Sequence, residues 1–202
     1  MFEFHELPIT ITLTEECLGM SPSDPDIYDA YIGSKAPDAM TREEEVAALG
    51  VQEVIEQGKT IFHRMPDGTP FIYGYQIRGF LKDSIGLLRR APKTESSKVK
   101  AYKKIVDGML MVKERQIPIR IPREGAVGQC QRPLRIDGPT GSRTALANSE
   151  TVPAGSTMDV TILMLDKALE PLVVECLDYG AWHGLGQWRN SGKGTFTWAK
   201  RR

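Results

Sequence analysis

Six segments with alternating strand-like and helix-like hydrophobic periodicity constrain the fold of this chain most. Strands are expected at 7–14, 109–113, 157–165 and 194–199, and helices at 76–90 and 168–181. In the first strand Ile9, Ile11 and Leu13 alternate with threonines, whereas in the first helix Ile77 and Phe80 begin a repeat of three and four residues. The order predicts an α+β chain with a ferredoxin-like (RRM-like) βαββαβ core.

Two long segments interrupt these elements. Residues 15–72 form a large insertion after the first strand, in which Thr41 and Glu44 make a capping box for a helix. Residues 123–149 are polar and rich in glycine, which predicts a projecting loop or hairpin. We expect a single domain, 1–202, that contains both segments.

The net charge is zero, but the charges are segregated along the chain. Residues 1–57 carry thirteen acids and two bases, whereas residues 78–104 carry nine bases and two acids. This polarity favours either a basic groove for a polyanion or a head-to-tail electrostatic match between copies of the chain. An ordinary charged surface whose signs happen to segregate is the alternative.

Cysteine usage and hydropathy exclude several classes of protein. Cys17, Cys130 and Cys176 are far apart and form no CxxC pair, which argues against a disulfide framework or a zinc knuckle. No apolar run reaches the length of a membrane span, and the first residues do not resemble a signal peptide. We therefore expect a cytoplasmic protein that does not associate with membranes.

The segment after the last helix is rich in glycine, aromatic residues and cations. Gly184 and Gly186 form one Gly-x-Gly pair and Gly192 and Gly194 a second one, and the run also contains Trp182, Trp188, Arg189 and Lys193. Glycine allows a positive φ and a close approach of another chain, and cations with aromatic rings suit a nucleic acid. A helix-to-strand connector with solvated charges is the other interpretation.

A nucleotide-binding P-loop is excluded at this segment. Five residues separate Gly186 from Gly192, and Lys193 is followed by Gly194 and not by Ser or Thr. A helix also precedes this loop and a strand follows it, which is the reverse of the P-loop order.

Three segments together resemble one family, the RAMP superfamily of CRISPR-associated proteins, and in particular its backbone subunit. In Tyr73–Lys82 a turn opens a helix that carries an arginine, a glycine and a lysine; in residues 141–156 an arginine segment precedes a Glu, a Pro-x-Gly turn and a strand. Residues 184–196 are similar to the family's C-terminal Gly-rich loop. The match covers about 125 residues, from Tyr73 to Trp198, whereas residues 15–70 align with no part of the family.

The resemblance implies sequence-independent binding of single-stranded RNA within a CRISPR-type effector complex of antiviral defence. Its partners would be a guide RNA, copies of this chain polymerised head-to-tail, and other subunits of the complex. Segment 113–150 would correspond to the family's thumb. The residues predicted to contact RNA are Arg78, Lys82, Arg89, Arg143, Gly184, Gly186, Trp188, Arg189 and Lys193.

The chain offers weak candidates for catalysis. Asp24, Asp26 and Asp29 form a cluster that would suit a divalent ion in RNA cleavage, but Asp-Pro and Ser-Pro pairs more often form turns. The histidines His5, His63 and His183 are far apart in sequence. We expect no catalytic residue, no bound metal and no cofactor.

Two other classes of function remain open at this level. One is a stand-alone protein, such as a phage- or element-encoded one, that binds single-stranded RNA or DNA. The other is an inhibitor that mimics the backbone subunit, because the acidic amino-terminal third would imitate nucleic acid or bind a basic neighbour.

Overall fold

The computed structural model describes residues 3–22, 59–138 and 141–201, and the helix predicted after Thr41 lies outside them. The chain separates into two compact units. The first unit contains residues 1–17, 63–126 and 152–202, and the second contains residues 18–62 and 127–151. The boundary divides the predicted segment 113–150, because 113–126 belongs to the first unit and 127–150 to the second.

A four-stranded antiparallel sheet is the centre of the first unit. It is formed by β1 (His5–Leu13), β7 (Leu110–Val112), β11 (Thr157–Met164) and β12 (Phe196–Lys200), in the order β12-β1-β11-β7. Ile9 in β1 lies opposite Val160 in β11 and Lys200 in β12. The first strand of the chain is therefore central, between the last strand and the strand that follows the hairpin of the second unit.

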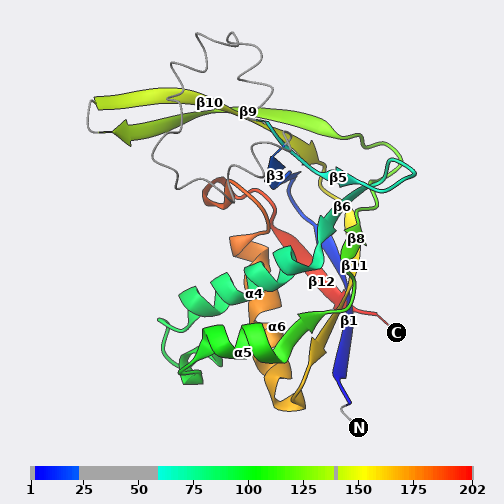
Figure 1. Ribbon diagram of the computed structural model, residues 1–202, viewed down its shortest axis with the longest axis vertical. Coiled ribbons are helices and arrows are strands. Elements are labelled where there is room, and N and C mark those ends of the chain that lie inside the picture. Colours follow the sequence, from blue (N-terminus) through cyan, green and yellow to red (C-terminus); the bar gives the residue numbers. More distant parts are fainter. Residues whose placement is uncertain (1–2, 23–58, 139–140, 202) are drawn as a thin grey trace, which may run out of the picture. The chain divides into compact units, whose positions relative to one another are not determined.

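Three helices lie on one face of this sheet: α4 (Gly74–Leu88), α5 (Tyr102–Met109) and α6 (Glu170–His183) (Figure 1). All six predicted elements are present in the predicted order, with each end within two residues of its expected place. Helix α6 begins later than predicted because Lys167–Leu169 forms a short 3-10 turn, η2. The Asp166 carboxylate caps this turn by accepting a hydrogen bond from the Ala168 N–H at 2.9 Å.

The core of the first unit fills the space between the sheet and the helices. Alternate residues of β1 and β11 point inward, as the period of a strand requires, and the helices contribute residues spaced by three and four. The buried side chains include Leu7, Ile9, Ile11, Leu13, Ile77, Phe80, Leu81, Ile85, Met158, Val160, Ile162, Met164, Leu172, Val173, Cys176, Leu177 and Phe196. This is the amphipathic pattern from which the elements were predicted.

A second antiparallel sheet of the first unit leads into α4. It consists of β5 (His63–Arg64), β6 (Pro70–Tyr73) and β8 (Gln116–Pro118), in the order β5-β6-β8. Residues 63–72 of the predicted insertion thus form part of the first unit. Where the chain passes from β7 to β8, the Glu114 carboxylate accepts a hydrogen bond from the Thr161 N–H at 2.8 Å and takes the place of a ladder carbonyl.

The second unit contains the predicted hairpin. Strands β9 (Gly128–Gly138) and β10 (Gly141–Val152) pair antiparallel, with Gly138 opposite Gly141. Three two-residue strands complete this sheet, β2 (Cys17–Leu18), β3 (Ser21–Pro22) and β4 (Thr60–Ile61), in the order β2-β10-β4-β3. Pro133 is accommodated because it lies in β9, which within the described residues pairs with β10 alone.

Gly180 in α6 and Gly79 in α4 allow a test of packing against helix propensity. A Cβ at Gly180 would overlap the Phe196 ring, whereas a Cβ at Gly79 in α4 meets open space. We predict that Gly180→Ala lowers the free energy of unfolding by about 1–3 kcal/mol through overpacking. Gly79→Ala, the matched control, should raise it by about 0.5–1 kcal/mol, because alanine is the better helix former. Urea denaturation measures both, and a stabilised Gly180→Ala variant would contradict this packing.

Candidate nucleic-acid interface

One face of α4 combines a cation, an aromatic ring and uncovered backbone. Tyr75, Arg78, Gly79 and Lys82 follow the i, i+3, i+4, i+7 spacing and so share this face. Arg78 is half-buried and forms no hydrogen bond or ion pair with any described residue. Apart from the adjacent residues and the backbone of α4 itself, no heavy atom lies within 4 Å of the place where a Gly79 Cβ would be. We call these four residues the α4 stripe.

The other two predicted cations of this region have partners within the chain. Lys82 Nζ lies 2.5 Å from Asp107 Oδ2 in α5, and the Arg89 guanidinium lies 5.2 Å from the centre of the Tyr102 ring. Exposed ion pairs contribute little to stability, so Lys82 can exchange its carboxylate partner for a phosphate at small cost.

The structure adds a set of cations that the motifs did not select. They are exposed, they form no ion pair with any described residue, and they lie at the end of α4, in the connection after it and in α5: Arg90, Lys93, Lys100, Lys103 and Lys104. We call them the α4–α5 basic cluster. The connection is held to α6 by Glu175, whose carboxylate accepts hydrogen bonds from the Ser96 N–H and Oγ at 2.9 and 2.6 Å. Their signal in the sequence was the charge balance of 78–104.

The glycines after α6 are required by the chain itself. Leu185 N–H donates to the Gly194 carbonyl at 2.7 Å, and Gly194 N–H donates to the Glu16 carbonyl at 2.8 Å. Gly184 has φ 72°, and a Cβ there would lie 2.5 Å from the Lys193 carbonyl oxygen. Gly186 has φ 80°. The close approach at Gly184 is thus made by the protein's own backbone, and its explanation does not need a ligand.

The two cations of this loop are paired with carboxylates of the same unit. Lys193 Nζ lies 2.5 Å from Glu16 Oε1, and Arg189 Nη1 lies 2.6 Å from Asp83 Oδ2. Both would have to exchange these carboxylates for phosphates in order to bind RNA. Their role as RNA contacts therefore remains a prediction.

Asp83 joins α4 to the end of α6. His183 Nε2 lies 2.8 Å from Asp83 Oδ2 and 2.6 Å from Arg189 Nη1. A neutral imidazole whose Nε2 donates to Asp83 has no lone pair there for Arg189, so the carboxylate is the shared partner. Partial burial raises the pKa of Asp83, but the hydrogen bonds with His183 and Arg189 outweigh it and hold that pKa below its ordinary value of 3.8.

Two tryptophans at this end of the first unit are exposed to different extents. Trp182 in α6 is 82% exposed, and Trp188 is 39% exposed. Trp188 has φ 56° and ψ 36°, in the left-handed region that bulky residues rarely adopt. Such strain is frequent at functional sites, which is compatible with the predicted role of Trp188.

The remaining sequence candidates are not brought together. Arg143 lies in β10, where it pairs with Ile136 in the second unit. Asp24, Asp26 and Asp29 lie outside the described residues. His5 contacts Glu170 at 2.9 Å, whereas His63 lies among aromatic rings. Among the residues that the structure describes, no group of three or more His, Cys, Asp or Glu side chains could hold a metal ion.

The outward positions of the main sheet carry no aromatic residue, and they include polar side chains as well as Met111 and Leu163. The Asp159 carboxylate accepts a hydrogen bond from the Thr10 hydroxyl at 2.7 Å and forms ion pairs with Arg120 at 2.9 Å and Arg201 at 3.0 Å. The outward positions of β1, β7, β11 and β12 contain no aromatic residue, because Trp198 shares the inward side with Phe196 and hydrogen-bonds Asp178 of α6. The stacking of bases on a sheet, as in RRM domains, is therefore not available here.

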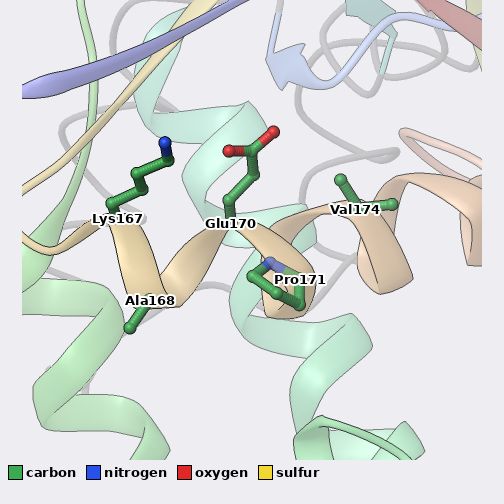
Figure 2. A pocket seen from close by; sticks show the side chains of 5 residues that line it. All are labelled: Lys167, Ala168, Glu170, Pro171 and Val174. Carbon is green, nitrogen blue, oxygen red and sulfur yellow. The ribbon is translucent and has the colours of Figure 1, made fainter.

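A recess of about 500 Å³ lies at the other end of α6. It is lined by Lys167, Ala168, Glu170, Pro171 and Val174, and the Lys167 and Glu170 side chains point to the same side (Figure 2). Glu170 is already bound to His5 and to Lys200, the latter at 2.6 Å. The recess contains none of the predicted site residues. No helix in the described part of the chain is long and apolar enough to cross a membrane.

Comparisons with known proteins find similar structures but no similar sequence. No model of a known protein family matches the chain, and no curated protein matches its sequence. The structure is similar to a chain in the cryo-EM structure of the Type III-B Cmr-beta bound to cognate target RNA, with a TM-score of 0.57 and 11% identity. That match covers 98% of this chain and 60% of the other, so this protein spans three fifths of the length of that subunit.

Two further structures are similar over most of both chains. Cmr6 from Pyrococcus furiosus has a TM-score of 0.49 and 12% identity, with 98% of this chain and 99% of Cmr6 covered. A chain of the Type IV-B CRISPR complex has a TM-score of 0.45 and 15% identity, with 98% and 90% covered. The match to the Type III-B chain confirms the predicted resemblance at the level of the fold, and its identity of 11% shows a similarity of fold alone.

The lowered pKa of Asp83 predicts an acid-dependent loss of stability. Because the pKa is lower in the folded than in the unfolded state, the stabilisation is complete above pH 3.8 and is lost as the pH falls below it. We predict that Asp83→Asn has a lower melting temperature than the parent protein near neutral pH, and that the two melting temperatures converge in acid. Thermal melts along a pH series measure the difference, and a constant gap down to the lowest pH would contradict the Asp83 pairing.

Proposed function

We propose that this protein is an RNA-binding backbone-type subunit of a CRISPR-type effector complex. It would bind single-stranded guide RNA without reading its sequence and would polymerise head-to-tail along it, beside other subunits of the complex. Such binding needs cations for phosphates and an uncovered backbone surface, and it needs no base-specific pocket.

The α4 stripe is the observation that carries this proposal. Its Arg78 has no acidic partner among the described residues, and the adjacent Gly79 leaves room for a polymer to approach the helix. The stripe lies in the segment Tyr73–Lys82, through which the sequence resembles the RAMP family. The fold supports the same assignment, because a similar chain belongs to an assembly bound to target RNA.

The topology supports the finer part of the fold assignment. A βαββαβ order with sheet order β12-β1-β11-β7 is the arrangement of a ferredoxin-like core, and we interpret the first unit in this way. We interpret the β9–β10 hairpin as the thumb, with Arg143 as an RNA contact on it. Arg189, Lys193, Gly184, Gly186 and Trp188 would contact RNA from the C-terminal loop.

The paired cations of the C-terminal loop favour a second candidate, a mimic of the backbone subunit. Arg189 and Lys193 are neutralised by Asp83 and Glu16, and the first 57 residues carry a large excess of acids. A chain of this kind would join or block an effector complex through its protein contacts. Co-purification with and without nuclease distinguishes the candidates, since a mimic would carry no RNA.

RNA affinity should depend steeply on salt and on Arg78. Each neutralised phosphate of a single strand contributes roughly 0.7 to the slope of log K against log salt. We predict that Arg78→Ala weakens binding at low salt and reduces the slope by about 0.7, as expected for one lost phosphate contact. Fluorescence anisotropy titrations of labelled RNAs of unrelated sequence, at several salt concentrations, measure both quantities.

Arg120→Ala is the matched control for this experiment. It removes the same charge from a side chain that pairs with Asp159 on the outer face of the sheet. It should leave the affinity and the slope unchanged. The proposal fails if the parent protein does not bind RNA at low salt, or if the slope is flat.

Self-association should follow from the segregated charges. We predict that the average mass in light scattering rises with protein concentration and rises further with RNA, because head-to-tail contacts need not close. Lys103→Glu with Lys104→Glu, in the α4–α5 basic cluster, should reduce it. A mass that stays that of a monomer at high concentration, with and without RNA, would remove the backbone-subunit assignment.

A further inference from the structure

We propose that Tyr75 is a nucleobase-stacking residue, so that the α4 stripe binds the bases of a single strand as well as its phosphates. This inference rests on the proposed RNA-binding function and deepens it. It assigns a role to a residue that was not among the predicted RNA contacts.

Among the described residues, Tyr75 is the last ring of an aromatic ladder. Its ring stacks on that of Tyr73 with centroids 5.3 Å apart and planes at 15°. Tyr73 in turn contacts the rings of Phe71 and His63 edge-on, each with a centroid distance of 5.1 Å. The ladder runs from β5 and β6 to the first turn of α4.

Exposure increases along this ladder from the core to the solvent. Phe71 is 3% exposed, Tyr73 is half-buried, and Tyr75 is 54% exposed. A largely exposed ring with a stack behind it is suited to receive another flat ring.

The base of the ladder is held firmly. The Tyr73 N–H donates to Gln76 Oε1 at 2.8 Å, and the Gly74 N–H donates to the Arg115 carbonyl at 3.0 Å. A Cβ at Gly74 would overlap the Glu114 carbonyl oxygen, which explains the glycine there. These contacts hold the backbone just before Tyr75, and its ring stacks on that of Tyr73, so that ordering the ring on binding costs less conformational entropy.

The surroundings of Tyr75 match one nucleotide and its backbone. Arg78 lies one helical turn further on the same face, and Gly79 beside it is uncovered. A base stacked on Tyr75 would place its own backbone along Arg78 and Gly79. The main sheet offers no competing platform, because its outward positions lack aromatic residues.

The test combines Tyr75→Leu with RNA that reports on stacking. The probes are an oligoadenylate containing 2-aminopurine and an abasic oligonucleotide of equal length. Tyr75→Leu should weaken oligoadenylate binding roughly 5- to 100-fold, the effect of one base–aromatic stack. The salt slope should not change, because no cation is removed. Quenching of 2-aminopurine on binding should be lost, and affinity for the abasic oligonucleotide should be unaffected.

Two controls make the outcome specific. Tyr75→Phe keeps the ring and should keep the parent affinity, and Phe4→Leu removes another exposed aromatic ring, at 39% exposure, and should have no effect. If Tyr75→Leu binds and quenches like the parent, the stacking role is overturned while RNA binding stands. If the parent protein binds neither probe at low salt, the proposed function fails, and the stacking role fails with it.

Discussion

The packing of Phe196 in β12 against Gly180 in α6 is the contact on which the first unit depends most. Phe196 is the first residue of β12, and its ring occupies the space that a side chain at position 180 of α6 would need. The same ring packs edge-on against Phe80 of α4 at 5.4 Å. One fully buried side chain of the last strand thus packs against two helices.

The C-terminal loop connects the end of α6 to the start of β12 in a tight turn, which explains its glycines. Between His183 and Phe196 the backbone turns back on itself, with Leu185 and Gly194 hydrogen-bonded and Gly184 and Gly194 at positive φ. Such a turn needs glycine whether or not the loop also binds a ligand. The loop can therefore be both a connector and an RNA contact. For RNA to bind there, Arg189 and Lys193 would exchange their carboxylate partners for phosphates.

The cations on the outer face of the sheet are paired with a carboxylate, whereas several cations on the helices are not. On the outer face of the sheet Arg120 and Arg201 are both bound to Asp159, so these two cations are neutralised. On the helical side, Arg78 and the α4–α5 basic cluster have no carboxylate partner among the described residues. A polyanion gains most free energy where cations are not already paired, because no existing interaction is lost on binding. The proposed RNA surface accordingly follows α4.

The sequence predicted the order of the core elements, whereas its RNA-contact residues remain predictions. Hydrophobic periodicity located all six core elements because the same alternation that buries Ile9 and Ile11 is visible in the chain itself. The hairpin was one of two alternatives. The boundary between the two compact units has no signal in the sequence, since contacts between distant segments leave no local pattern. For the site, motif reasoning selected residues by type and could not see that Arg189 faces Asp83, which is 106 positions away.

The sequence by itself determined the α+β order of elements, the segregation of charge and the resemblance to RAMP proteins, because each of these depends on neighbours along the chain. Only the tertiary structure decided which cations are neutralised, which glycines are needed internally, and that Tyr75 is the exposed end of a ring ladder from β5 and β6. These properties depend on side chains that folding brings together from distant positions, and a single sequence does not record their distances.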